Sequence, residues 1–129
     1  MRLVLATRNP HKVGEFQALV APHVLEPLAA AVDLGPEVGL TFAENALGKA
    51  VAAATGTGRP AIGDDSGIEA AALGGAPGIY SRRYAGERAS DEENLAKLIR
   101  DAPAGTGLAY VCALAFVDPD TGDEVVFEG

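Results

Sequence analysis

The chain has 129 residues, the size of one domain, and a domain of this size buries a core without disulfides or a structural metal. Hydrophobic residues make up 48% of it, which excludes intrinsic disorder. The net charge of −8 argues against binding to a nucleic-acid polymer, which needs a basic face. A single nucleotide stays compatible with this charge, because a few cations, backbone N–H groups and a metal suffice to hold a triphosphate.

The sequence has one cysteine, so an internal disulfide is impossible. It opens directly on a strand-like run, without the basic and apolar regions of a signal peptide, and no stretch approaches the length of a membrane span. We therefore expect a cytoplasmic protein that has no contact with a membrane.

The first half of the chain alternates strand and helix signals. Asn9 and Pro10 form a helix start, and Thr41 with Glu44 fits a capping box. The predicted elements are a strand at 2–6, a helix from 10 to about 20, a strand at 24–28, turns at 33–40 and a helix from 41 to about 55.

The second half opens with a short apolar run at 61–63, interpreted as the end of a buried strand that leads into a turn at 64–67. A glycine-rich stretch follows over 67–86, then a helix from the capping box at Ser90 to about Arg100, and two strands at 108–117 and 124–127. We expect a single α/β domain over residues 1–129, with a central mixed β-sheet flanked by helices.

The segment Thr7-Arg8-Asn9-Pro10-His11-Lys12 lies between the first strand and the first helix. A helix N-terminus attracts anions, Thr7 and Asn9 offer hydrogen bonds, and Lys12 offers a charge for phosphate. The alternative is structural: Asn9 caps the helix and Lys12 is solvated. This segment alone does not decide between the two interpretations.

Asp64-Asp65-Ser66-Gly67 brings two carboxylates together, which is unfavourable unless a cation or proton relieves their repulsion. Their hard oxygens suit Mg²⁺, one carboxylate is suited to orient or deprotonate a water, and Ser66 is suited to bind a phosphate. The alternative is an Asx-type turn in which these side chains bond only to the local backbone.

Two further segments carry candidate residues. Glu37 lies in the loop before the second helix, where it is able to reach a metal, while Glu44 fits a capping role better. Asn45 and Lys49 are four residues apart and so share one helix face, and Lys49 is either a phosphate contact or an ordinary surface lysine.

Arg82 and Arg83 lie in the glycine-rich stretch. They are either phosphate ligands or part of a surface loop with an arginine stacked on a tyrosine.

Taken together, four segments closely resemble the inosine/xanthosine triphosphate pyrophosphatase family, the Ham1-like or dITP/XTP pyrophosphatases. The segments are LATRNPHK, GLTFAENALGKA, AIGDDSGIEA and LGGAPGIYSRRYAG, in this order, and the resemblance covers essentially all 129 residues. It implies an α/β fold, a homodimer, Mg²⁺ as cofactor, and hydrolysis of ITP, dITP and XTP to the monophosphate and pyrophosphate.

The resemblance also implies roles for particular residues. Asp65 matches the proton acceptor and metal ligand, Glu37 the second acidic metal ligand, Ser66 a substrate contact and Lys49 a lysine near the phosphates. The stretch from Thr7 to Lys12 (Thr7, Arg8, Asn9, Pro10, His11 and Lys12) matches the phosphate-binding loop. Asp64 accompanies Asp65 without an assigned role.

The chain departs from the family pattern in three places. Arg8 stands where many members have Gly, and Arg82 where many have Ala. Members usually continue for roughly another sixty residues after a strand like that at Phe127, through segments that grip the base, so the resemblance implies a C-terminally truncated domain. We expect weak or absent activity of these 129 residues. Three alternatives to the family assignment are a non-catalytic nucleotide-binding remnant, a Maf-like nucleotide pyrophosphatase and a plain α/β domain.

Overall fold

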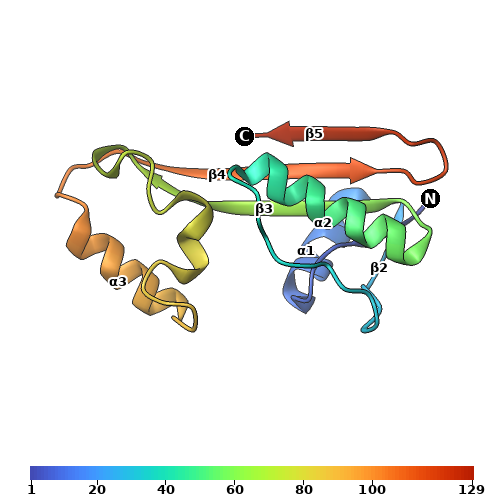
Figure 1. Ribbon diagram of the computed structural model, residues 1–129, viewed down its shortest axis with the longest axis horizontal. Helices are drawn as coiled ribbons and strands as arrows, with labels where there is room; N and C mark the ends of the chain where they lie inside the picture. Colours follow the sequence, from blue (N-terminus) through green and yellow to red (C-terminus); the bar gives the residue numbers. More distant parts are fainter. The chain divides into compact units, whose positions relative to one another are not determined.

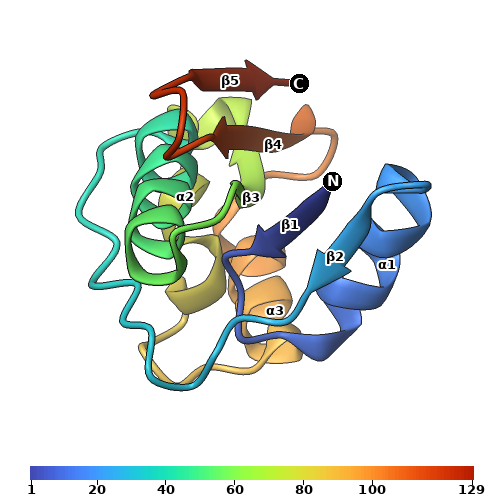
Figure 2. The same ribbon diagram turned by 90° about the vertical axis from the view of Figure 1, so that its right-hand side faces the viewer.

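The computed structural model describes all residues from 1 to 129 and contains one five-stranded sheet in the order β2-β1-β3-β4-β5 (Figures 1 and 2). β1 is parallel to β2 and β3, and β4 is antiparallel to β5, which confirms the predicted mixed sheet. The strands are β1 Arg2–Leu5, β2 Val24–Glu26, β3 Ala61–Ala70, β4 Leu108–Val117 and β5 Glu124–Glu128. The α-helices are α1 Pro10–Val20, α2 Phe42–Thr57 and α3 Asp91–Asp101.

The chain forms two compact units. The first consists of Met1–Asp65 with Ala113–Glu128, and the second of Ser66–Cys112 with Gly129. The expectation of a single domain over residues 1–129 stays a prediction. No helix is long and apolar enough to cross a membrane.

Local capping explains where the helices begin. Asn9 accepts a hydrogen bond from the N–H of His11, with Pro10 in the first turn of α1, as the sequence predicted. Ser90 and Glu93 form the complete capping box of α3. At α2 only half of the predicted box forms, because Thr41 caps the helix while the carboxylate of Glu44 binds the N–H of Leu40.

Within the first unit, α1 and α2 cover opposite faces of the sheet (Figure 2). On the α1 side, Leu3, Leu5 and Leu25 form a buried cluster against which the helix packs Val13, Phe16 and Val20, with Ile62 of β3 beside them. Leu19, in contrast, is 79% exposed. Leu19 directly precedes Val20 in the chain, and residues adjacent on a helix point about 100° apart, so only one of them faces the cluster.

The opposite face is built from very small side chains. A Cβ added to Gly63 would lie 2.2 Å from the carbonyl oxygen of Ala46 and 2.8 Å from the backbone nitrogen of Ala50. The backbone of α2 therefore lies directly against β3, and Ala46, Ala50 and Ala53 are completely buried there. Because neighbouring strand residues point to opposite faces, Ile62 meets α1 and Gly63 meets α2.

This close approach makes Gly63→Ala a destabilising substitution. The new methyl group meets backbone atoms, which have no rotamer to escape to, so we expect the free energy of unfolding to fall by about 2–3 kcal/mol. Urea denaturation measures this. Gly48→Ala is the matched control, because nothing lies within 4 Å of a Cβ there and alanine favours the helix by roughly 0.5–1 kcal/mol. Equal midpoints for the two variants would contradict the packing described.

The prediction of a turn at 64–67 is wrong, because β3 runs without interruption from Ala61 to Ala70. The strand lies next to β4 in the sheet, so its extended backbone continues through residues 64–67 without a turn. The strand geometry also excludes the Asx turn that was the alternative explanation of the two aspartates.

The second unit organises the glycine-rich stretch. It contains two short 3₁₀ helices, η1 Ala71–Leu73 and η2 Gly78–Arg83, where the sequence predicted no element. The buried amide of Asn94, on α3, donates to the carbonyl of Arg82 and accepts from the N–H of Ala85, which ties this stretch to the helix. The guanidinium of Arg83 lies 5.0 Å from the ring centre of Tyr80, the stacked arrangement that the structural interpretation anticipated.

Candidate functional site

The candidate site lies where β1 ends. The pairing of β1 with β3 stops at Leu5 and Ile62, and β3 then continues alone on that side with Gly63, Asp64 and Asp65. The chain leaving β1 enters α1 within five residues. The carboxyl ends of parallel strands are the usual ligand-binding edge of an α/β sheet, and the aspartates lie at this edge.

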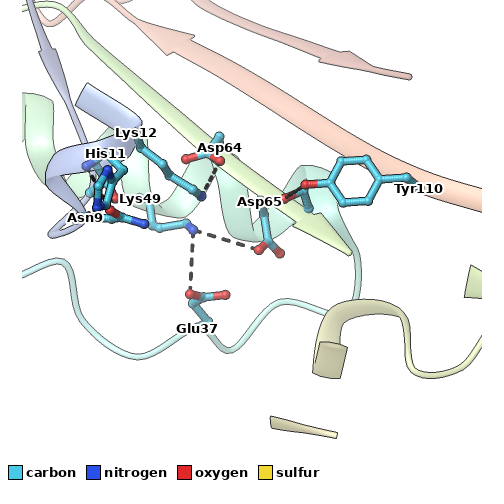
Figure 3. A network of polar contacts seen from close by, with 10 residues as sticks. Asn9, His11, Lys12, Glu37, Lys49, Asp64, Asp65 and Tyr110 are labelled. Atoms are coloured by element: carbon cyan, nitrogen blue, oxygen red, sulfur yellow. Dashed lines mark hydrogen bonds and ion pairs between the residues drawn. The ribbon is translucent and has the colours of Figure 1, made fainter. Parts of the chain in front are cut away.

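The two aspartates point to opposite faces of the sheet, since they are consecutive in a strand. Asp64 is directed to the α1 side, where the ammonium of Lys12 contacts its Oδ2 at 2.7 Å (Figure 3). Asp64 is 3% exposed, and its other oxygen, Oδ1, is buried without a hydrogen-bond partner. Lys12 is therefore paired, and the interpretation of Lys12 as an ordinary solvated lysine is wrong.

Asp65 is directed to the α2 side, where three polar residues surround it. Asn45 donates to its Oδ2 at 3.1 Å, and the ammonium of Lys49 lies 3.9 Å from its Oδ1. The same ammonium lies 3.6 Å from Oε1 of Glu37, so both carboxylates converge on one lysine (Figure 3). The shared helix face of Asn45 and Lys49, predicted from their spacing of four, is confirmed. Both residues were candidates in the sequence analysis, but the contact of Asn45 with Asp65 was not predicted.

The environment of Asp65 perturbs its ionisation. Burial raises the pKa of this carboxyl above its usual range, because removal from water disfavours the charged form. The hydrogen bond from Asn45 and the charge of Lys49 lower the pKa in part, while Glu37 and Asp64 add repulsion that raises it. A carboxylate with a raised pKa beside a second carboxylate is a typical place for a cation or for proton transfer.

Some polar groups at the N-terminus of α1 form hydrogen bonds with one another. Asn9 caps the helix on His11, and its own N–H is bound by the hydroxyl oxygen of Thr7 at 3.1 Å. The capping role proposed as an alternative for Asn9 is therefore confirmed. Pro10 begins the helix and brings Lys12 to Asp64, so the segment reaches the site through that lysine.

Arg8 points elsewhere. Its guanidinium donates to the carbonyls of Leu28, Ala29 and Val32, in the loop that leads from β2 toward Glu37. A planar guanidinium that donates to three carbonyls of one loop holds that loop in place. These bonds offer a structural use for the arginine that stands where the resembled family often has glycine, and its predicted contact with phosphate stays a prediction.

Replacement of Arg8 separates these two uses. Arg8→Ala removes all three bonds, so we expect the free energy of unfolding to fall by about 1–2 kcal/mol and amide exchange over 27–33 to accelerate. Urea denaturation and hydrogen-exchange mass spectrometry measure these effects. Arg8→Lys keeps the positive charge but not the planar fork, so its stability should lie between that of Arg8→Ala and that of the unaltered chain. Unchanged stability with weakened nucleotide binding would instead support the phosphate contact.

Ser66 is the first residue of the second unit. Its hydroxyl oxygen accepts a hydrogen bond of 2.8 Å from the hydroxyl of Tyr110, on β4. Tyr110 was not a candidate, because it lies in an apolar strand run that carries no functional signal. The residue is 70% exposed, so the pair lies at the surface of its unit.

Glu37 and Asp65 fit a hard cation such as Mg²⁺. They supply oxygen ligands from two separate segments, and both already turn toward one positive charge, that of Lys49. No group of three or more His, Cys, Asp or Glu side chains is arranged to hold a metal. Mg²⁺ is commonly held by one or two carboxylates together with waters and substrate phosphates, so two carboxylates are a sufficient donor set.

Comparison with known proteins places the chain in a family. The sequence profile of the Ham1 family matches residues 3–129. The chain belongs to the Ham1 family. This Ham1 chain is 55% identical to the dITP/XTP pyrophosphatase of Pectobacterium atrosepticum, over 90% of the chain and 62% of that relative. It is 47% identical to the dITP/XTP pyrophosphatase of Ralstonia nicotianae, over 99% of the chain and 68% of that relative.

Solved Ham1 structures share the fold. The HAM1 protein of Coxiella burnetii matches with a TM-score of 0.88 at 35% identity, over 100% of this chain and 70% of that one. The nucleoside-triphosphatase, dITP/XTP pyrophosphatase, of Mycobacterium abscessus matches with a TM-score of 0.81 at 35% identity, over 100% and 71%. The Ham1 chain therefore spans about two thirds of the length of these relatives, 62% for the Pectobacterium protein.

Proposed function

We propose that this Ham1 chain carries the phosphate- and metal-binding part of an enzyme that hydrolyses dITP, ITP and XTP to the nucleoside monophosphate and pyrophosphate. One observation carries the proposal: two helices each deliver a lysine, Lys12 and Lys49, to two adjacent aspartates of β3, just beyond its pairing with β1. A metal-bound triphosphate requires both kinds of group, since lysines bind its phosphates and carboxylates hold its metal. The names of the relatives supply the substrate class.

Phosphoryl chemistry assigns each residue a part. Asp65 accepts the proton of the attacking water, a role that competes with metal binding by the same carboxylate; the water oxygen bonds to the α-phosphorus, and the bond from that phosphorus to the oxygen bridging it to the β-phosphate breaks, which releases pyrophosphate. Bound between Glu37 and Asp65, Mg²⁺ would neutralise charge on the phosphates. Lys49 and Lys12 balance the negative charge that gathers on the leaving group.

The remaining contacts follow from the resemblance. We propose that the loop from Thr7 to Lys12, with its capped helix N-terminus and His11, lines the phosphates, and that Ser66 binds the substrate through its hydroxyl. Selection of a 6-oxo purine requires polar groups that the correct base satisfies and a wrong base leaves unpaired. The family match favours this assignment over the Maf-like alternative.

We further propose that the protein acts in the cytoplasm as a homodimer. The resemblance to the family supplies this proposal, because its members usually form homodimers. Light scattering coupled to size exclusion measures the mass directly. A monomer at micromolar concentration would refute the dimer for this chain.

Product analysis tests the proposed activity. The chain is incubated with Mg²⁺ and, in turn, dITP, XTP and dATP, and pyrophosphate and phosphate are measured separately. Release of pyrophosphate from dITP and XTP in preference to dATP supports the enzyme. Nucleotide binding by calorimetry without release would support the non-catalytic remnant, which the coverage of only 62% of a relative keeps as the second candidate.

A further inference from the structure

Asn45 is a buried side chain whose amide forms a hydrogen bond at each end within the site. It is 5% exposed and lies in the first turn of α2. Its Nδ2 donates to Oδ2 of Asp65 at 3.1 Å, and its Oδ1 accepts from the N–H of Gly39 at 2.8 Å. The carboxylate only accepts and the N–H only donates, so these partners determine the orientation of the amide.

The loop that carries Glu37 approaches this amide as closely as a glycine allows. A Cβ on Gly39 would lie 2.6 Å from Oδ1 of Asn45 and 2.8 Å from the Cβ of Glu44. Gly39 is only two residues from Glu37, whose carboxylate shares Lys49 with Asp65. One amide therefore connects β3, through Asp65, to the loop, through Gly39.

We propose that Asn45 is a positioning residue that sets the separation of the Glu37 and Asp65 carboxylates. It holds Oδ2 of Asp65, which leaves Oδ1 turned toward Lys49, and it fixes Gly39, which brings Glu37 to the same place. It acts on a bound cation through these two carboxylates. The inference rests on the proposed function in taking Glu37 and Asp65 as ligands of one cation.

Two substitutions remove the connection in different ways. Asn45→Ala deletes both bonds and leaves a space, whereas Asn45→Leu deletes both bonds but fills the space with a side chain of similar size. Agreement between them separates the lost bonds from lost packing, and either one that folds is sufficient for the test. Circular dichroism establishes which variants are folded.

A neighbouring residue provides the matched control. The carboxylate of Glu44 accepts from the N–H of Leu40 at 2.7 Å, one residue beyond Gly39, and has no contact with Asp65. Glu44→Ala therefore loosens the same loop while the bond between Asn45 and Asp65 remains. A residue that merely tethers the loop would behave like Glu44.

The probe is Mn²⁺ alone, with binding measured by electron paramagnetic resonance, alongside amide exchange over 33–40. In the Asn45 variants we expect Mn²⁺ binding to weaken about 10–100-fold, the usual effect of removing a residue that orients metal ligands, and the loop amides to exchange faster. In Glu44→Ala we expect faster exchange with Mn²⁺ affinity within about threefold of the unaltered protein, because Asp65 keeps its orientation.

Three results would overturn the proposal: undiminished Mn²⁺ binding in folded Asn45 variants, equal weakening in Glu44→Ala, or no Mn²⁺ binding by the unaltered chain. These measurements need no turnover. If the unaltered chain binds Mn²⁺ but releases no pyrophosphate, the proposed function fails while the role of Asn45 is still decided. Where pyrophosphate is released, the Asn45 variants should lower kcat and raise the Mg²⁺ requirement, with little change in KM for the nucleotide.

Discussion

Asp65→Asn is expected to lower pyrophosphate release by about 10²–10⁴-fold, the range found when a positioned general base is removed. The substitution keeps the shape of the side chain and an oxygen for the hydrogen bond from Asn45, so the loss reports the charge and basicity of the carboxylate. Initial rates with dITP and Mg²⁺ measure it. Activity within threefold of the unaltered chain would remove Asp65 from the mechanism.

The same substitution should stabilise the protein when metal is removed. Burial raises the pKa of Asp65, so ionising it costs the folded state more than the unfolded state. The penalty is absent below the ordinary pKa of 3.8 and is complete once the pH exceeds the raised pKa. With a chelator at neutral pH, Asp65→Asn should therefore have a higher Tm than the unaltered chain, and the difference should narrow as the pH falls toward 3.8.

Glu44→Gln serves as control for the activity loss, because it changes a carboxylate of the same neighbourhood that binds only the N–H of Leu40. Its rate should stay within about threefold of the unaltered chain, since neither carboxylate that faces Lys49 is altered. A similar loss in both variants would show that any charge change around α2 impairs the protein, and would weaken the assignment of Asp65.

Lys12→Met is expected to impair both stability and activity. Asp64 is 3% exposed and has one oxygen without a partner, so loss of the contact at 2.7 Å leaves a buried carboxylate uncompensated. The expected loss in the free energy of unfolding is about 2–4 kcal/mol, below the upper end for buried pairs because the Lys12 side chain is 30% exposed. Pyrophosphate release should fall as well, because the lysine also balances phosphate charge.

A double substitution divides these effects. Adding Asp64→Asn to Lys12→Met removes the uncompensated charge, so urea denaturation should show recovery of much of the lost stability. Activity should not recover, since no cation has been restored beside the phosphates. If the double variant is as unstable as Lys12→Met alone, the pair at 2.7 Å is not what holds Asp64 in the core.

The amino-acid sequence by itself determined the elements and most of their boundaries. Helix starts at Asn9, Thr41 and Ser90 depend on side chains that bond backbone groups within a few residues, which is local information. The spacing of Asn45 and Lys49 likewise sufficed to place both on one face of a helix. The mixed sheet followed from the alternation of strands and helices with a late hairpin.

Only the tertiary structure decided how the site is divided between the two faces of the sheet. The sequence presented Asp64 and Asp65 as neighbours in a turn, whereas β3 continues through them beyond its pairing with β1 and sends one to Lys12 and the other to Lys49. The bonds of Arg8 to carbonyls some twenty residues away, and the link that Asn45 makes between a loop and a strand, were likewise not predictable from the sequence. Such contacts depend on which strands pair and which faces the helices cover, and these are non-local choices that no short motif encodes.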